Sequence, residues 1–246
     1  MDMIILEGTL SCKAAIEKNA RQDMILFVDE KKRTRDFSWI IRQAKAHDIP
    51  VIACPRQRID EMTGSRSHGG MALQCSSRHI PPLREIPAPA GFLCYIEGVE
   101  DPHNLGSVCR TLYAAGCRLL VIPRRDWSRS ETVIMRASAG TWEKLNIAAV
   151  DEPDQLPDYL KQAGIPLLAA ERKDAVPLFQ YKFPDTFCLA IGGAMRGLSR
   201  EINETAAIHI YIPYNSDMHA ALDTPSACAV FAFAYAGEIY DKTQNQ

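Results

Sequence analysis

The chain has 246 residues, which is enough for one large domain or two smaller ones with a buried core. Its 47% hydrophobic and 24% charged residues are those of an ordinary globular protein, and its formal net charge of −2 excludes a strongly basic chain. No segment reaches the roughly 20 apolar residues of a transmembrane helix, and the N-terminus lacks a signal-peptide pattern. We therefore expect a cytoplasmic protein with no membrane partner.

The eight cysteines contain no C-x-x-C pair, and five of them lie in apolar or helical contexts (Cys94, Cys109, Cys117, Cys188 and Cys228). This pattern favours small buried thiols over a disulfide framework or a metal cluster. The sequence therefore predicts no metal site.

Basic residues are concentrated toward the N-terminus. Residues 1–90 hold 14 lysines and arginines against 11 acidic residues, whereas residues 91–246 carry a net charge of −5. The clusters at 31–35 and 56–58 could meet phosphate groups or could simply be solvated surface.

The first part of the chain alternates between helical and strand patterns. We expect helices over 11–21 and 37–46, strands over 24–28 and 50–54, and a glycine-rich loop from Thr63 that leads into a short strand. This alternation predicts a small layered α/β domain over residues 1–80.

Four prolines within residues 81–90 exclude a helix or a central strand. We expect this segment to be an extended linker to a second domain, residues 91–246.

The second domain shows a longer strand and helix alternation. Almost continuously apolar runs predict buried parallel strands at 91–99, 118–123, 145–150, 166–170, 187–191 and 208–212. A helix capped by Asn104 or Ser107 should end at Gly116, another should span 131–137, and the last should span 224–240. There Thr224 is the expected N-cap and Pro225 the first helical residue.

Ligands of parallel sheets bind outside the carboxyl ends of the strands, so the loops at 100–106, 192–198 and 213–223 are candidate sites. Gly192, Gly193 and Gly197 let the backbone approach a ligand closely. They fit neither a dinucleotide fingerprint, because Ala194 stands where a glycine is needed, nor a P-loop, because Leu198 stands where lysine is needed.

The order of these loops resembles the SpoU (TrmH-like) branch of the SPOUT superfamily of RNA methyltransferases. The first family motif is matched by Asn104, Gly106 and Arg110, the second by the three glycines, and the third in outline over 212–229, with "RASAG" (136–140) between the first two. More weakly, "GSRSHGGMAL" resembles part of the ribosomal-protein-like substrate-binding domain of many members.

The resemblance implies methyl transfer from S-adenosyl-L-methionine to a ribose 2′-hydroxyl of rRNA or tRNA. It implies an α/β SPOUT domain with a mainly parallel sheet and a deep trefoil knot, a small N-terminal RNA-binding domain, and a homodimer. The implied cofactor-binding residues are Gly192, Gly193, Gly197, Ile212, Leu222 and Ala227.

The implied catalytic residues are Asn104, Arg110 and Ser226. A guanidinium almost never loses its proton, so we expect Arg110 to clamp phosphate and position the hydroxyl, although family proposals also make it the general base. Arginine's fork matches phosphate geometry.

The chain departs from the family pattern at four positions. Ala194 replaces a glutamate and Asp223 replaces an asparagine, while Ala221 and Pro225 stand where the family has serines, for which the neighbouring Ser226 could substitute. An alternative is therefore a weakened or inactive RNA-binding or ribosome-assembly relative with the same fold.

A small-molecule α/β enzyme is a third hypothesis. Cofactor binding separates the first two, and both predict salt-sensitive RNA binding.

Overall fold

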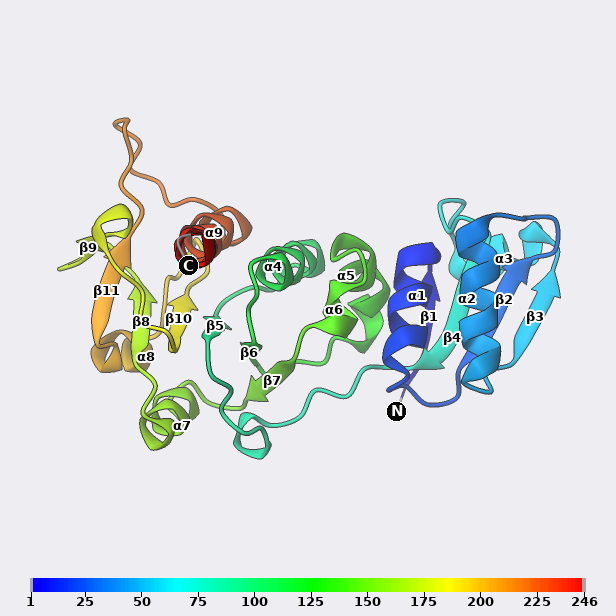
Figure 1. Cartoon of the computed structure of the whole chain (residues 1–246), viewed down its shortest axis with the longest axis horizontal. Coiled ribbons are helices and arrows are strands. Elements are labelled where there is room, and N and C mark those ends of the chain that lie inside the picture. Colours follow the sequence, from blue (N-terminus) through cyan, green and yellow to red (C-terminus); the bar gives the residue numbers. More distant parts are fainter. Residues whose placement is uncertain (1, 245–246) are drawn as a thin grey trace. The chain divides into compact units, whose positions relative to one another are not determined.

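The computed structural model describes residues 2–244, which divide into two compact units (Figure 1). The N-terminal unit joins the chain up to His79 with residues 126–144. The C-terminal unit consists of residues 80–125 and the chain from Leu145 onward.

The N-terminal unit is a four-stranded mixed sheet with the order β1-β4-β2-β3. Strands β1 and β2 each pair antiparallel with β4, and β3 pairs parallel with β2. The strands are β1 (Met3–Glu7), β2 (Ile25–Asp29), β3 (Val51–Cys54) and β4 (Met71–Ser76), and the helices of the first 79 residues are α1 (Thr9–Lys18), α2 (Arg35–Ala46) and α3 (Arg56–Thr63). The expected small α/β domain is confirmed, but β1 and α3 were not predicted.

Helices α5 (Glu131–Ala137) and α6 (Thr141–Lys144) pack against this sheet unit through a buried ion cluster. The Arg21 guanidinium lies 2.6 Å from carboxylate oxygens of both Glu131 and Glu143, and all three side chains are only 1–2% exposed. Burial alone would lower the pKa of Arg21, but the two carboxylates raise it above its ordinary value. The cluster therefore fixes α5 and α6 to the N-terminal unit.

The C-terminal unit is built on a seven-stranded sheet with the order β7-β6-β5-β10-β8-β11-β9. Every pairing in it is parallel, which confirms the expected sheet type. The strands are β5 (Phe92–Ile96), β6 (Leu119–Pro123), β7 (Ile147–Val150), β8 (Leu167–Ala170), β9 (Val176–Pro177), β10 (Phe187–Ile191) and β11 (Ile208–Tyr211). The trefoil knot implied by the resemblance stays a prediction.

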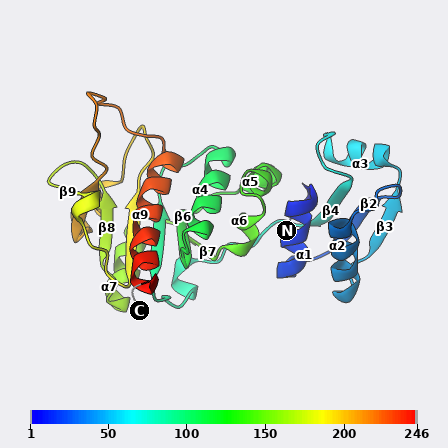
Figure 2. The same ribbon diagram turned by 45° about the horizontal axis from the view of Figure 1, so that its top comes forward.

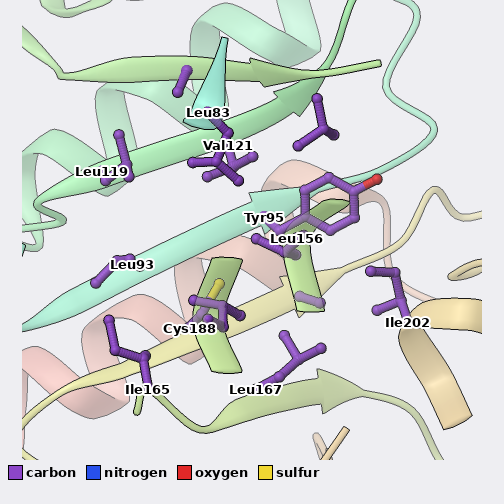
Figure 3. Close-up of a cluster of buried hydrophobic side chains, with 14 of the residues drawn as sticks. Leu83, Leu93, Tyr95, Leu119, Val121, Leu156, Ile165, Leu167, Cys188 and Ile202 are labelled. Carbon is purple, nitrogen blue, oxygen red and sulfur yellow. The ribbon is translucent and has the colours of Figure 1, made fainter. Parts of the chain in front are cut away.

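Helices cover both faces of this sheet (Figures 1 and 2). Helices α4 (Pro102–Ala114) and α9 (Thr224–Gln244) lie on one face, and α7 (Gln155–Ala163) and α8 (Arg200–Thr205) on the other. Successive side chains of β5 point to opposite faces of the sheet, as in any β-strand. Phe92 contacts Tyr235 of α9, whereas Leu93 lies in the core beneath α7 and α8 (Figure 3).

The proline-rich segment is attached to the C-terminal unit rather than being a free linker. The amide of Ala149 in β7 donates to the carbonyl of Pro81 at 2.9 Å. Leu83, in the short 3₁₀ turn Leu83–Glu85, is 2% exposed and belongs to the sheet core (Figure 3). The segment therefore contributes to the fold of the second unit.

Two helix starts differ from the expectation. Helix α4 begins at Pro102, and Asp101 caps it by accepting a hydrogen bond from the Asn104 amide at 2.8 Å, so neither Asn104 nor Ser107 is the cap. Helix α9 begins at Thr224, and Asp223 accepts from the Ser226 amide at 2.7 Å. In both helices the cap is an aspartate that precedes the expected residue, by three or six positions at α4 and by one at α9. A carboxylate is favoured there because it also interacts with the positive end of the helix dipole.

All eight cysteines are buried free thiols, as expected. Among the described residues, no group of three or more metal-ligating side chains is placed to hold an ion. No helix within residues 2–244 has the length and apolar character needed to cross a membrane.

We predict that Arg21→Met destabilises the protein by about 3–5 kcal/mol, because it leaves the Glu131 and Glu143 carboxylates buried without a cation. Urea unfolding of the full chain measures this loss. The matched control is Arg58→Ala, whose side chain is 62% exposed and lies 4.0 Å from Glu61; it should cost less than about 1 kcal/mol. Equal stability of the two variants would contradict the assigned role of the cluster.

Candidate active site

A cavity of about 240 Å³ opens at the carboxyl ends of β8, β10 and β11. Its wall combines small and apolar side chains with the backbone of the two loops that follow β10 and β11. The lining residues are Ala170, Glu171, Arg172, Ile191, Gly192, Gly193, Ala194, Gly197, Ile210, Tyr211, Ile212, Tyr214, Ala221, Leu222, Ala227 and Phe231. The cavity thus lies at the edge of the sheet where parallel-sheet ligands bind.

The loop after β10 folds tightly back on itself. The Gly197 amide donates to the Gly193 carbonyl at 2.8 Å, and Gly197 has a φ of +67°. A Cβ atom on Gly192 would lie 2.3 Å from the Gly197 carbonyl carbon and 2.5 Å from the Leu198 nitrogen. Since both atoms belong to the backbone, only glycine fits at position 192.

The same loop lies against the end of β5. A Cβ on Gly193 would come within 2.9 Å of the Gly98 carbonyl oxygen, so the two backbones touch here. The Glu97 side chain reinforces the contact by accepting a hydrogen bond from the Ser199 amide at 2.8 Å. This contact brings the segment that leads into α4 next to the cavity loop.

The loop between β11 and α9, drawn in orange in Figure 1, is tied to the cavity at both ends. The Leu222 amide donates to the Tyr214 hydroxyl at 3.0 Å, and the Arg172 guanidinium lies 4.3 Å from the centre of the Tyr214 ring. The Thr224 hydroxyl donates to the Gly192 carbonyl at 3.2 Å. Thr224 thus joins the second and third loops instead of capping the helix.

Asp223 has a structural role at the start of α9. Hydrogen bonds from Ser226 hold the pKa of the Asp223 carboxyl below its ordinary value. Aspartate and asparagine are about equally good N-caps, so a carboxylate here preserves the helix start that an amide would give.

The structure separates the predicted site residues into two groups. All six residues expected to bind cofactor line the cavity: Gly192, Gly193, Gly197, Ile212, Leu222 and Ala227. The three residues expected to act on RNA do not line it. Asn104 and Arg110 are exposed on α4, and Ser226 is exposed in the first turn of α9, the helix packed beside α4.

Several lining residues lie outside the loops that the sequence singled out, among them Glu171, Arg172 and Phe231. The first two follow directly after the apolar run of β8, so the strand-end rule applied to that strand would have found them. Phe231 lies two turns into an apolar helix, where no local signal separates a core residue from a ligand contact.

The cavity fits the adenosine part of S-adenosylmethionine. Its floor is apolar, which suits a purine ring, and the glycines leave backbone groups open where any side chain would fill the space. The residues present are therefore able to hold the cofactor mainly through their backbone.

We predict that Gly192→Ala abolishes binding of S-adenosylhomocysteine, since the new methyl group would displace the backbone of 197 and 198. Calorimetric titration measures the affinity, and circular dichroism checks the fold. The matched control is Gly237→Ala in α9, outside the cavity lining, where a Cβ meets nothing within 4 Å; it should keep wild-type affinity. Unchanged binding by the Gly192 variant would show that the ligand does not depend on this loop.

Two family models match the chain. The SpoU rRNA methylase family matches residues 91–233, and the substrate-binding domain of RNA 2′-O ribose methyltransferases matches residues 5–81. The first match contains most of the C-terminal unit together with residues 126–144, and the second contains most of the first 79 residues.

Relatives and solved structures agree with these matches. The chain is 23% identical over 234 residues to the 23S rRNA (guanosine-2′-O-)-methyltransferase RlmB of Shewanella oneidensis, covering 93% of this chain and 95% of that protein. The AdoMet-bound rRNA methyltransferase of Sinorhizobium meliloti has a TM-score of 0.80 at 20% identity, over 96% of this chain and 88% of that one. The AviRb methyltransferase of Streptomyces viridochromogenes, in complex with AdoMet, has a TM-score of 0.79 at 18% identity, over 97% of this chain and 91% of that one. At these identities the structures show a shared fold, and the match over 91–233 shows the family: this chain belongs to the SpoU rRNA methylase family.

Proposed function

We propose that this chain methylates a ribose 2′-hydroxyl of rRNA or tRNA, with S-adenosylmethionine as the methyl donor. The observation that carries the proposal is the glycine-walled cavity at the ends of β8, β10 and β11, within the part of the chain that matches the SpoU family. When bound, the cofactor supplies an electrophilic methyl group on a sulfonium.

Six residues would hold the cofactor: Gly192, Gly193 and Gly197 of the loop after β10, and Ile212, Leu222 and Ala227 of the segment after β11. Gly192 and Gly193 offer unobstructed backbone, and the third loop covers the cavity because Tyr214 and Thr224 tie it down. Burial of the adenosine excludes water from this side of the site.

Asn104 and Arg110 would act on the RNA. Both are exposed on α4, whose N-terminal segment is held near the cavity by the contact between Gly98 and Gly193. We assign Arg110 to a phosphate of the target nucleotide, where its charge would hold the ribose hydroxyl in place for attack on the methyl group. Ser226, also exposed, is a second candidate to position that hydroxyl.

We also propose that two chains form a homodimer through α4 and α9. These neighbouring helices expose large apolar side chains: Tyr113 on α4 is 45% exposed, and Phe233 and Tyr240 on α9 are 53% and 64% exposed. Phe233 and Tyr240 are seven residues apart and so lie on one face of the helix. Exposed apolar faces of this kind mark association surfaces.

The cytoplasm is the compartment that we propose for this protein. Eight free buried thiols are stable in a reducing environment, where disulfides do not persist.

An inactive RNA-binding relative is the second candidate, and the observation that favours it is Ala194. This residue lines the cavity but brings no polar group into it. Failure to bind cofactor would support this candidate.

We predict that wild-type protein binds S-adenosylhomocysteine with micromolar affinity at about one site per chain. Arg110→Ala should keep this affinity within twofold, because Arg110 does not line the cavity, and lower methyl transfer to RNA by at least about 100-fold. Calorimetry and a filter-binding assay with labelled methyl donor measure the two effects. Arg118→Ala, which changes another exposed arginine directly before β6, is the control and should leave both values unchanged. If the wild-type chain binds neither cofactor nor product, the proposed function is wrong.

For the homodimer, we predict that Phe233→Glu yields monomers of 27.4 kDa in sedimentation velocity, whereas the wild type sediments at about twice this mass. Phe179→Glu, which changes an aromatic residue that is 70% exposed but lies outside α4 and α9, should stay dimeric. Dissociation by the Phe179 change alone would place the interface elsewhere.

A further inference from the structure

The cavity wall contains only two charged side chains, Glu171 and Arg172, among the lining residues given above. Both follow directly after β8, which lies between β10 and β11 in the sheet. The Glu171 amide donates to the Ile210 carbonyl at 3.1 Å, so the pairing with β11 continues one residue past the strand. The backbone of Glu171 is therefore fixed at the middle of the cavity rim.

The Glu171 carboxylate is oriented but not neutralised. One oxygen, Oε1, accepts hydrogen bonds from the Arg172 amide at 2.6 Å and from the Lys173 amide at 3.5 Å. The neighbouring guanidinium is directed elsewhere, over the Tyr214 ring. Among the described residues no ion pair involves Glu171, and a carboxylate has about four acceptor sites. Half-buried and unpaired, it has acceptor capacity left for a ligand.

We propose that Glu171 binds the cofactor by accepting hydrogen bonds from the ribose hydroxyls of S-adenosylmethionine; this inference rests on the proposed function. The adenine fits the apolar part of the cavity, formed by Ile210, Leu222 and Phe231. For Arg110 to act on the target nucleotide, the sulfonium would face β5 and α4, the helix that carries Arg110. The ribose connects the adenine to the sulfonium. In the sheet, β8 lies between β11 and β10, and β10 is next to β5, so Glu171 at the end of β8 lies between the two ends of the cofactor.

The chemistry of the two partners is complementary. A ribose diol presents two adjacent hydroxyl donors, and a carboxylate presents two oxygens, as in the acidic residue that binds the ribose in dinucleotide sites. Apart from the Arg172 guanidinium, the rest of the wall offers backbone groups, apolar atoms and two tyrosines, so Glu171 is the only side-chain carboxylate available to the diol in the described cavity.

This role bears on the alanine at position 194. Ala194 and Glu171 line the same cavity from the ends of adjacent strands, β10 and β8. The cavity therefore keeps one carboxylate although the glycine loop brings none.

Calorimetric titration of the full-length wild type and of Glu171→Gln tests the assignment. The ligands are S-adenosylhomocysteine, its 2′,3′-dideoxy analogue, and 5′-methylthioadenosine, which keeps the ribose but lacks the amino acid. We expect Glu171→Gln to weaken binding of S-adenosylhomocysteine and of 5′-methylthioadenosine by the same factor, about tenfold, because a charge-assisted hydrogen bond becomes a neutral one. The dideoxy analogue should bind both proteins equally.

Asp174→Asn is the matched control. It removes a negative charge three residues away, outside the cavity lining, and Asn tolerates the φ of +53° at this position. It should bind all three ligands as the wild type does, and thermal unfolding should show both variants folded.

Three results would overturn the inference. If Glu171→Gln weakened binding of the dideoxy analogue as much as binding of S-adenosylhomocysteine, Glu171 would not act through the ribose hydroxyls. Weakening for S-adenosylhomocysteine but not for 5′-methylthioadenosine would assign it to the amino group of the cofactor. Unchanged affinity for all ligands would remove it from the site. Failure of the wild type to bind S-adenosylhomocysteine is a different result, because it overturns the proposed function itself.

Discussion

The backbone of Gly192 passes so close to residues 197 and 198 that no side chain fits between them, and the site depends on this contact. The tight loop leaves backbone groups open along one wall of the cavity. Gly193 adds a second close approach, to Gly98, and so joins the cavity to the segment that begins α4. Two backbone contacts thus set the relation between the cofactor pocket and the helix that carries Arg110.

The start of α9 shows how a chain can depart from its family pattern and keep the structure. Asp223 caps the helix as an asparagine would, and Thr224 is freed to bind the Gly192 carbonyl. The third loop is consequently anchored to the second. The cavity shows a similar substitution. The glycine loop has Ala194 and so brings no carboxylate into the cavity, but Glu171, directly after the neighbouring strand β8, does.

Much of the C-terminal sheet could be predicted, because fully buried parallel strands are near-continuous apolar runs. The glycine loop was also recognisable, since only glycine tolerates its contacts. The caps were mistaken by one or more residues, because Asp101 and Asp223 compete with neighbours that are equally good caps in isolation. The buried partnership of Arg21 with Glu131 and Glu143 joins residues more than 100 positions apart, so no local pattern reveals it.

The central claim is that the chain methylates a ribose hydroxyl of RNA. The most direct test incubates the protein with rRNA and tRNA pools and methyl-labelled S-adenosylmethionine, digests the RNA to nucleosides, and separates them by mass spectrometry. The account predicts label in a 2′-O-methylnucleoside. Label confined to base-methylated nucleosides, or no label although the protein binds the cofactor, would contradict it.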